Sequence, residues 1–310
     1  RMTCPNPEKF YPPITTLALR EGAMQNKVAL ITGGGTGIGK AIAKTFAALG
    51  AKVAIAARRM DVLEAAAAEI RRETGGVCEA FRMDIKDAKQ VAEAIDQIEK
   101  RFGQTPNVLV NNAAGNFLMA TERMSDNAMS SIVEIVLKGT MRVTKEIGSR
   151  CIKNGTGCAV LSITVPWARA GAPFFVPSAS SKAGVEIMTK SLATEWGKYG
   201  IRLNVIAPGP FPTEGAFGRL SFMNFDQTTE AFASMVPAGR CGALEELGNL
   251  ASFLCSDYGS YVSGAIIDMD GAQQHHNHGS APSARLHEMT SEDWAVAEAT
   301  IRAKTNKSKI

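Results

Sequence analysis

The stretch Thr32–Gly39, which reads TGGGTGIG, constrains the fold of this chain more than any other feature. A short apolar run, Val28–Thr32, precedes it, and a helical pattern over Ile38–Leu49 follows it. Glycine permits positive φ and close packing of a helix against a strand. The stretch therefore predicts a strand, a tight turn and a helix in direct succession, the opening of a βαβ unit.

The same alternation continues along most of the chain. Further strands are expected at Lys52–Ala57, near Ala80–Met83, and at Val108–Val110, Cys158–Ile163, Ile201–Ala207 and Ala265–Met269. Helices are expected over Asp61–Thr74 and Ala88–Phe102, around Asn127–Lys153, over roughly Ser181–Tyr199, and over Leu244–Cys255. Strands that alternate with helices of this length form parallel sheets with right-handed crossovers and helices on both faces. The sequence predicts an α/β fold, namely a Rossmann-type doubly wound parallel sheet of about seven strands in a single domain.

Composition excludes several classes of protein. The chain has 310 residues and a net charge of only +4, which does not indicate a nucleic-acid-binding surface. No apolar run is long enough to predict a membrane span. The six cysteines lie far apart without a C-x-x-C pair, and such spacing favours reduced thiols over a disulfide framework. His275, His276 and His278 share one loop without cysteine or carboxylate companions at ligand spacing, so no metal site is expected.

The glycine-rich turn is a candidate dinucleotide site. Its backbone lets a pyrophosphate approach closely, and the helix that follows presents unpaired N–H groups and a favourable dipole to an anion. The predicted cofactor-binding residues of this turn are Gly33, Gly34, Gly35, Thr36, Gly37, Ile38 and Gly39.

The end of the second strand indicates which dinucleotide binds. NAD-binding folds place a carboxylate there for the ribose 2′-OH, but this chain reads Ala56-Ala57-Arg58-Arg59. Two guanidinium groups suit a 2′-phosphate, which arginine can hold through bidentate, charge-assisted bonds. The pattern predicts NADPH; the alternative is that Arg58 and Arg59 are a solvated, basic start of a helix.

Four motifs together resemble the short-chain dehydrogenase/reductase family. They are TGGGTGIG, Asp84-Ile85 after the third strand, Asn111–Gly115 after the fourth, and Pro208-Gly209 after the sixth. The resemblance covers about residues 27–271 and implies cofactor contacts by Asp84, Lys182, Pro208, Gly209, Pro210 and Phe211. The expected organisation is an N-terminal extension over residues 1–26, an NADP-binding short-chain reductase domain over 27–271, and a C-terminal loop and helix over 272–310. In that last helix, expected over Ser291–Thr305, Trp294, Ala297 and Ile301 fall on one face.

A closer resemblance is to the 2,4-dienoyl-CoA reductases of the mitochondrial type. It rests on Asn112–Phe117, Ile135–Thr140, Leu161–Thr164, Pro177–Ser180, Glu195–Gly200 and Gly215–Phe217, and runs nearly end to end. It implies NADPH-dependent reduction of a 2,4-dienoyl-CoA to a 3-enoyl-CoA in β-oxidation of unsaturated fatty acids, and a homotetramer built by the two long helices. It also implies a mitochondrial location, although the terminal Ser308-Lys309-Ile310 differs by one residue from the peroxisomal S-K-L signal.

The catalytic residues that this resemblance implies are Asn116, Ser178 and Lys182, together with the position of Trp167. Many reductases of this layout carry a tyrosine four residues before the lysine, where this chain has Ser178. Reduction of a conjugated thioester moves negative charge to the thioester oxygen, so the site needs hydrogen-bond donors there rather than a phenol. Asn116 would donate to that oxygen, Lys182 would hold the cofactor ribose, and Ser178 would join this network or cap its helix.

The family's acyl-CoA contacts map onto Arg58, Lys86, Asn116, Phe117, Ser125 and Arg219. Apart from Asn116, each of these residues, taken alone, is also compatible with an ordinary surface or lining position. Lys86 and Ser125 are the least specific of the set.

Trp167 departs from the family pattern, because the mitochondrial enzymes have a proton-donating tyrosine at this place. An indole N–H donates a hydrogen bond but does not give up its proton near neutral pH. The peroxisomal members use an aspartate on the preceding helix, where this chain has Val136; Glu134 is two residues away and is expected to point elsewhere. Three interpretations remain open: a bound water protonates the carbon, the chain is a weak or altered reductase, or it binds NADPH with little catalysis. A carbonyl-reducing short-chain dehydrogenase is the rival within the same fold.

Overall fold

A single seven-stranded parallel sheet forms the centre of the molecule. The computed structural model describes residues 9–116, 118–215, 224–276 and 290–307. The strands are β1 (Val28–Thr32), β2 (Lys52–Ala57), β3 (Val77–Arg82), β4 (Val108–Asn111), β5 (Cys158–Ile163), β6 (Ile201–Pro208) and β7 (Ile266–Met269). Their order is β3-β2-β1-β4-β5-β6-β7, and every neighbouring pair is parallel. The predicted doubly wound fold is confirmed.

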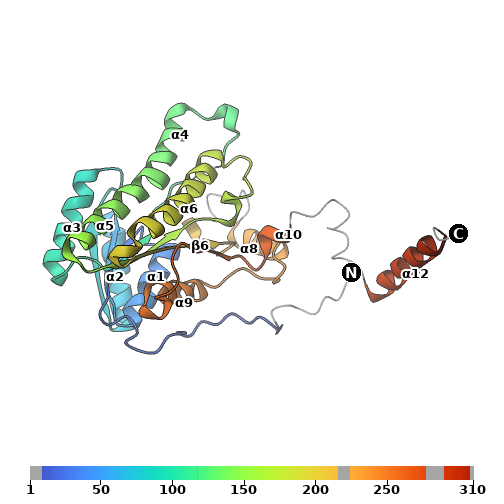
Figure 1. Ribbon diagram of the computed structural model, residues 1–310, viewed down its shortest axis with the longest axis horizontal. Coiled ribbons are helices and arrows are strands. Elements are labelled where there is room, and N and C mark those ends of the chain that lie inside the picture. The colour runs from blue at the N-terminus through green and yellow to red at the C-terminus, as the bar shows by residue number, and fades with distance from the viewer. Residues whose placement is uncertain (1–8, 117, 216–223, 277–289, 308–310) are drawn as a thin grey trace.

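Two helical layers cover this sheet (Figure 1). One apolar core packs α1 (Gly37–Ala48), α2 (Met60–Thr74) and α9 (Leu244–Cys255) against one face. The other packs α3 (Ala88–Phe102), α5 (Thr140–Asn154) and α6 (Val176–Trp196) against the opposite face. The strands are apolar on both faces because both are covered, as parallel sheets require.

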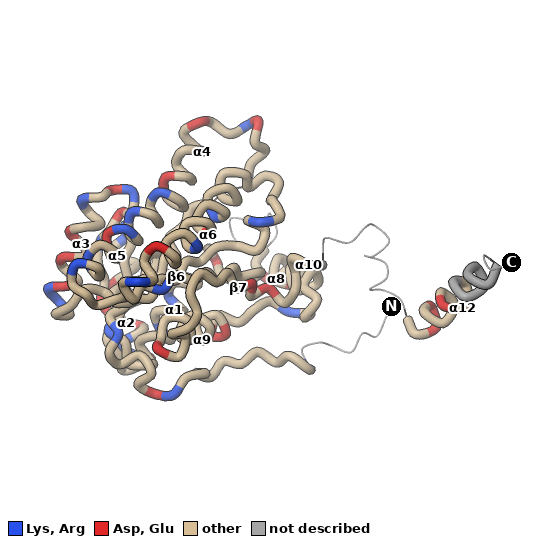
Figure 2. Tube along the Cα trace, in the orientation of Figure 1, with Lys and Arg blue, Asp and Glu red and all other residues tan. Residues whose placement is uncertain are grey.

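The outer surfaces of these helices carry charges of both signs (Figure 2). On α5, Arg150 lies 2.6 Å from Asp96 and 2.9 Å from Glu99, both on α3. Its Nε also donates to Glu146, one turn away on its own helix, at 2.9 Å. Mixed charge of this kind solubilises a helix face without creating an anion-binding surface.

The helix predicted around Asn127–Lys153 is interrupted. It consists of α4 (Asp126–Val133), a π-helical segment over Glu134–Gly139, and α5. A π-helical segment inserts one extra residue into the hydrogen-bond repeat, and it is frequent at functional sites. This insertion rotates the residues on either side of it, a displacement that a regular 3.6-residue period cannot predict.

Other boundaries also differ from the expected ones. Helix α6 begins at Val176, five residues earlier than predicted, because Pro177 can occupy a first helical turn without losing a hydrogen bond. Strand β3 begins at Val77 and not at Ala80. Helix α8 (Phe225–Ser234) was not predicted, and the short helix α10 (Gln273–His276) lies where an exposed loop was expected.

The described part of the N-terminal extension runs along α9. Asn249 on α9 donates to the Thr16 carbonyl and accepts from the Ala18 amide, at 2.8 and 2.9 Å. The Arg240 guanidinium donates to the Tyr11 carbonyl at 2.8 Å. Helix α12 (Ser291–Lys307) lies apart from the sheet and its helical layers (Figure 1).

No helix among the described residues combines the length and the apolar content that a membrane-spanning helix needs. Within residues 9–116, 118–215, 224–276 and 290–307, no three histidine, cysteine, aspartate or glutamate side chains are placed to hold a metal ion.

Candidate active site

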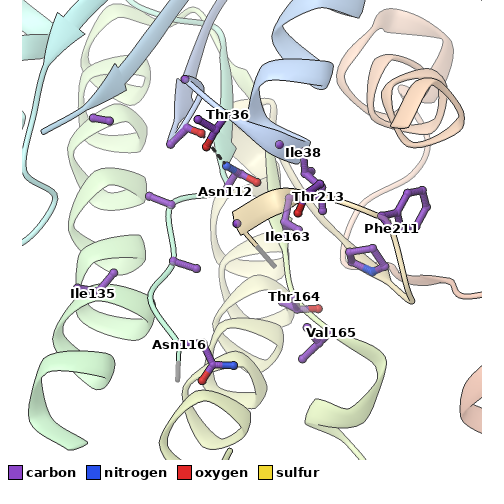
Figure 3. A pocket seen from close by; sticks show the side chains of 18 of the residues that line it. Thr36, Ile38, Asn112, Asn116, Ile135, Ile163, Thr164, Val165, Phe211 and Thr213 are labelled. Atoms are coloured by element: carbon purple, nitrogen blue, oxygen red, sulfur yellow. Dashed lines mark hydrogen bonds between the residues drawn. The ribbon is translucent and has the colours of Figure 1, made fainter. Parts of the chain in front are cut away.

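A cavity of about 700 Å³ opens at the carboxyl ends of the strands, beside the point where the strand order reverses between β1 and β4. Ligands of doubly wound sheets bind at such a point, because the loops leave the two neighbouring strands in opposite directions. Figure 3 shows Thr36 and Ile38 at one end of this pocket and Asn116 at the other, with Thr164 and Val165 between them and Thr213 and Phe211 to one side.

The glycine-rich turn is held in place by the residues after β4. The Asn112 amide donates to the carbonyls of Thr32 and Gly33, at 3.0 and 3.2 Å. The hydroxyl of Thr32 accepts from the backbone amides of Asn112 and Ala113, both at 3.0 Å. The first helix therefore starts from a turn that is fixed to the neighbouring strand.

The glycines of this turn do two different things. Gly33 and Gly37 have φ of 67° and 53° and line the pocket, together with Gly35, Thr36 and Ile38. Gly34 and Gly39 do not line it. A Cβ on Gly39 would lie 2.5 Å from both the Asn112 amide nitrogen and the Gly33 carbonyl, and one on Gly34 would lie 2.5 Å from Ile55. These two predicted cofactor residues permit close packing rather than contact with a ligand.

The end of β2 presents Arg58 and Arg59 to the pocket, beside Val62 and Leu63. Asp84, after β3, also lines the pocket, and its carboxylate accepts from the Lys86 amide at 3.0 Å. No carboxylate from the end of β2 is among the lining residues. Lys86 itself is exposed and lies outside the lining, so its predicted contact with the substrate has no support from the pocket.

Lys182 reaches the pocket from the second turn of α6. Its side chain is buried, and its Nζ donates to the Ile163 carbonyl at the end of β5 at 2.5 Å. Burial lowers the pKa of Lys182 to about 8. Pro208, Gly209, Pro210 and Phe211, which are predicted to contact the cofactor, also line the pocket.

Ser178 lies one turn before Lys182 and is buried, but it is not among the lining residues. It is the third residue of α6, whose N-cap residue is Phe175, so the interpretation of Ser178 as a helix cap is wrong. The early start of α6 explains the difference, since the predicted helix began only at Ser181.

Trp167 lines the pocket from a short 3₁₀ turn, Pro166–Ala168. Its ring stacks at 32° on Phe175, with ring centroids 5.7 Å apart, and Phe175 also lines the pocket. Asn116 lines the far end. Its amide oxygen is buried and has no hydrogen-bond partner within the part of the chain that the structure describes, which marks a polar group oriented for a ligand.

The remaining predicted substrate residues are not brought to this pocket. Phe117 and Arg219 lie outside the described residues. Ser125 caps α4 by accepting from the Ala128 amide at 3.3 Å, and it does not line the cavity. On the interrupted helix, the carboxylate of Glu134 lies 3.3 Å from the Lys138 ammonium group and does not line the pocket. The next residue, Ile135, does line it.

Sequence reasoning missed several lining residues, namely Ile135, Thr164, Val165, Phe175, Thr213, Phe232 and Gln273. Thr164 and Val165 could have been found, because residues directly after a central strand lie at the ligand-binding edge of a parallel sheet. Phe232 and Gln273 come from helices that the sequence did not predict.

The pocket fits a nicotinamide dinucleotide. Its turn leaves no room for side chains, its β2 end offers two guanidinium groups, and its buried Lys182 places a cation within reach of a ribose.

Comparisons with known proteins agree with this geometry. A family model described as enoyl-(acyl carrier protein) reductase matches residues 33–272. A Caenorhabditis elegans protein named "Probable 2,4-dienoyl-CoA reductase 3", (3E)-enoyl-CoA-producing, is 58% identical over 308 residues, 99% of this chain and 100% of that protein. The peroxisomal 2,4-dienoyl-CoA reductase of Danio rerio is 35% identical over 248 residues, 80% of this chain and 81% of that protein.

A solved structure of a short chain dehydrogenase from Bacillus anthracis is 38% identical, with a TM-score of 0.74 over 83% of this chain and 100% of that chain. Family match, sequence relatives and solved structure all point to the same fold and the same group of enzymes. The chain therefore belongs to the short-chain dehydrogenase/reductase family, and within it to the 2,4-dienoyl-CoA reductases.

Proposed function

We propose that this protein catalyses the NADPH-dependent reduction of a 2,4-dienoyl-CoA to a 3-enoyl-CoA in the β-oxidation of unsaturated fatty acids. The observation that carries the proposal is the 58% identity, over 99% of this chain, with a relative named a probable 2,4-dienoyl-CoA reductase, (3E)-enoyl-CoA-producing. The pocket supports it, because Asn116, Trp167 and Lys182 line one cavity together with the dinucleotide turn.

NADPH, when bound, supplies the hydride for this reduction. Gly33, Gly35 and Gly37 would hold its pyrophosphate, and Arg58 and Arg59 its 2′-phosphate. Lys182 would bind the ribose hydroxyls and add positive charge beside the nicotinamide. Pro208–Phe211 would form the wall behind that ring.

The substrate side of the pocket stabilises the charge that reduction places on the thioester oxygen. Asn116 presents a buried amide with an unpartnered oxygen, and rotation of the amide brings its N–H group to the same place. The Trp167 indole offers a second donor. A neutral donor aimed at a developing oxyanion contributes more to the rate than to substrate binding, because the charge appears only as the reaction proceeds.

The assembly and location are part of the proposal. A homotetramer would bring together the outer faces of α5 and α6. A mitochondrial location fits the family type, while the peroxisomal alternative rests on Ser308–Ile310, which lie outside the described residues, and on the peroxisomal relative from Danio rerio.

The test follows NADPH absorbance with purified protein and a trans-2,cis-4-dienoyl-CoA, beside the variants Trp167→Tyr and Trp167→Phe. We expect turnover by the wild type, a faster rate for Trp167→Tyr, which adds a phenolic proton, and no gain for Trp167→Phe. The same assay with NADH is expected to give weaker binding, since Arg58 and Arg59 have no 2′-phosphate to hold.

Contrary outcomes separate the parts of the proposal. Bound NADPH without turnover by wild type or Trp167→Tyr would make the chain a catalytically silent binding protein. Reduction of a ketone in preference to the dienoyl-CoA would place it with the carbonyl reductases. Tighter binding of NADH than of NADPH would contradict the role of the two arginines.

A further inference from the structure

The proposed reaction needs a proton for a substrate carbon, and the Trp167 indole cannot give one near neutral pH. The pocket contains another group with an exchangeable proton close by. Thr164 lies three residues before Trp167 and lines the same cavity (Figure 3). Its hydroxyl donates to Oε1 of Glu186 at 3.0 Å.

Glu186 lies directly behind this threonine. It is on α6, one turn after Lys182, and is 2% exposed. It is not among the lining residues, whereas Thr164, to which it is hydrogen-bonded, is, so Thr164 stands between the carboxyl group and the cavity. We propose that Glu186 is the proton reservoir of this pocket and that the Thr164 hydroxyl carries its proton to the substrate; the inference rests on the proposed reductase function.

The step balances as a two-bond relay. Reduction leaves a dienolate, with its negative charge shared among the thioester oxygen, carbon 2 and carbon 4. When Glu186 is protonated, its carboxyl O–H donates to the Thr164 oxygen, and the threonine hydroxyl turns its own proton toward the substrate. A C–H bond forms at carbon 2 while the O–H bond of Thr164 breaks. The Thr164 oxygen takes the proton of the Glu186 carboxyl group, and Glu186 is left as a carboxylate. Solvent returns a proton to Glu186 before the next cycle, so the net reaction consumes one proton from water.

The groups that face Glu186 come from four elements. Arg169 follows the Trp167 turn, and its Nε lies 3.4 Å from Oε2 of Glu186. Asp268 on β7 pairs with the same guanidinium, and Lys190 lies one turn further along α6. Burial raises the pKa of Glu186, the nearby charge of Asp268 raises it further, and the Thr164 hydrogen bond, Arg169 and Lys190 oppose that rise.

This arrangement suits a reservoir that must both hold and release a proton. The raised pKa keeps the acid form present to higher pH than in an ordinary glutamate. Arg169 stabilises the carboxylate that forms after delivery. Its side chain is 36% exposed, so water can reach the far side of the pair and restore the proton without passing through the cavity.

The test compares Glu186→Gln with Glu195→Gln. Glutamine keeps the size of Glu186 and can still accept from Thr164, but it has no acid proton to pass on. We expect kcat to fall by ~10²–10⁴-fold, the usual contribution of general acid catalysis, while KM for the dienoyl-CoA and the NADPH Kd stay within twofold. Glu195→Gln makes the same substitution at an exposed position on the same helix, outside the relay.

The pH profile separates a relay from a merely structural role. Because the acid form of Glu186 is the donor, wild-type kcat should fall as pH rises through the pKa of Glu186. The Glu186→Gln variant should not show this fall of kcat with pH. Thr164→Val removes the hydroxyl, and combining it with Glu186→Gln should cost no more than either change alone, because both interrupt one path. An unchanged rate and pH profile in Glu186→Gln would overturn the relay and leave the proposed function standing.

A measurement without turnover isolates the reservoir itself. Infrared difference spectra of the unliganded wild type should show a carboxylic C=O band that titrates above the ordinary glutamate range and is absent from Glu186→Gln. If the wild type lacks that band, Glu186 does not store a proton, and the proposal is refuted whether or not the enzyme is active. Failure of the wild type to reduce a dienoyl-CoA while the band is present would instead refute the proposed function.

Discussion

Lys182 is a charged side chain that this fold buries, whereas lysine side chains are usually solvated. Its ammonium group is buried and donates to one backbone carbonyl, and burial lowers its pKa from 10.5 to about 8. In the unfolded chain the same lysine keeps its proton until about pH 10. Between these two values the unfolded chain binds more protons, so the free energy of unfolding should rise with pH in that window.

Replacement of Lys182 should therefore stabilise the protein while abolishing its activity. At pH 7 we expect Lys182→Met to raise the free energy of unfolding by about 1–3 kcal/mol, because it removes the cost of burying a charge and loses one hydrogen bond. Denaturant unfolding at pH 7 and pH 9.5 measures this gain, which should shrink at the higher pH. The exposed Lys145→Met on α5 is the control, with no change expected; a destabilised Lys182→Met would show that the ammonium is paired better than its surroundings indicate.

Among the elements, the junction of β1 and α1 is the most tightly constrained. Gly39 is the third residue of α1, and a Cβ there would meet both the Asn112 amide and the Gly33 carbonyl at 2.5 Å. Neither partner can withdraw easily, since Asn112 holds the turn through two carbonyls.

Gly39→Ala should consequently damage the cofactor site more than the fold. We expect NADPH affinity to fall at least tenfold and the free energy of unfolding to fall by about 1–3 kcal/mol, the usual cost of overpacking. Gly197→Ala is the matched control, because φ is −54° there and a Cβ would meet nothing within 4 Å. Fluorescence titration with NADPH and thermal unfolding measure the two effects; equal affinities for the two variants would contradict the packing role of Gly39.

The interrupted helix shows what sequence patterns miss at this scale. The stretch around Asn127–Lys153 is predicted as one continuous helix, because each part of it has an apolar face with ordinary spacing. The π-helical segment shifts the phase by one residue, so Ile135 lines the pocket while Val136 is buried away from it. A single extra residue in a hydrogen-bond repeat does not change the composition of the segment. The position of the π-helical segment therefore depends on its packing against α6, which the sequence pattern does not reveal.

At the scale of the whole molecule, the long helices α5 and α6 lie side by side (Figure 1). Each of them leaves a large apolar side chain in solvent. Met141 on α5 is 45% exposed and Ile187 on α6 is 62% exposed. Apolar side chains at such positions are expected to be covered when chains associate.

Ile187→Glu should weaken the proposed homotetramer. Placing a charge in a desolvated interface is costly, so we expect light scattering to give the mass of four chains for the wild type and a smaller assembly for the variant. Val77→Glu, at a 43% exposed position on β3 at the other edge of the sheet, should keep the wild-type mass. A monomeric wild type would exclude the tetramer, and an unchanged Ile187→Glu would move the interface to another face.

The sequence by itself determined the sheet, its parallel direction and the cofactor turn. Those features depend on local rules, namely apolar runs that alternate with helices and glycines where a strand meets a helix. The sequence motifs also picked out four residues that line the pocket, Arg58, Asp84, Lys182 and Phe211. This was possible because residues at the ends of parallel strands, or on the helices that follow them, meet at one edge of the sheet.

Only the tertiary structure decided which residues near those motifs face the pocket. In the structure, the predicted site residues Lys86, Ser125 and Ser178 do not line the pocket. Thr164, which was not predicted, does line it and is hydrogen-bonded to Glu186. The physical reason is that side-chain direction depends on where each helix starts and how its turns pack against others. The hydrogen bond between Thr164 and Glu186 joins the residue that follows β5 to a residue of α6, which no local pattern connects, and it forms because α6 packs beside the end of β5.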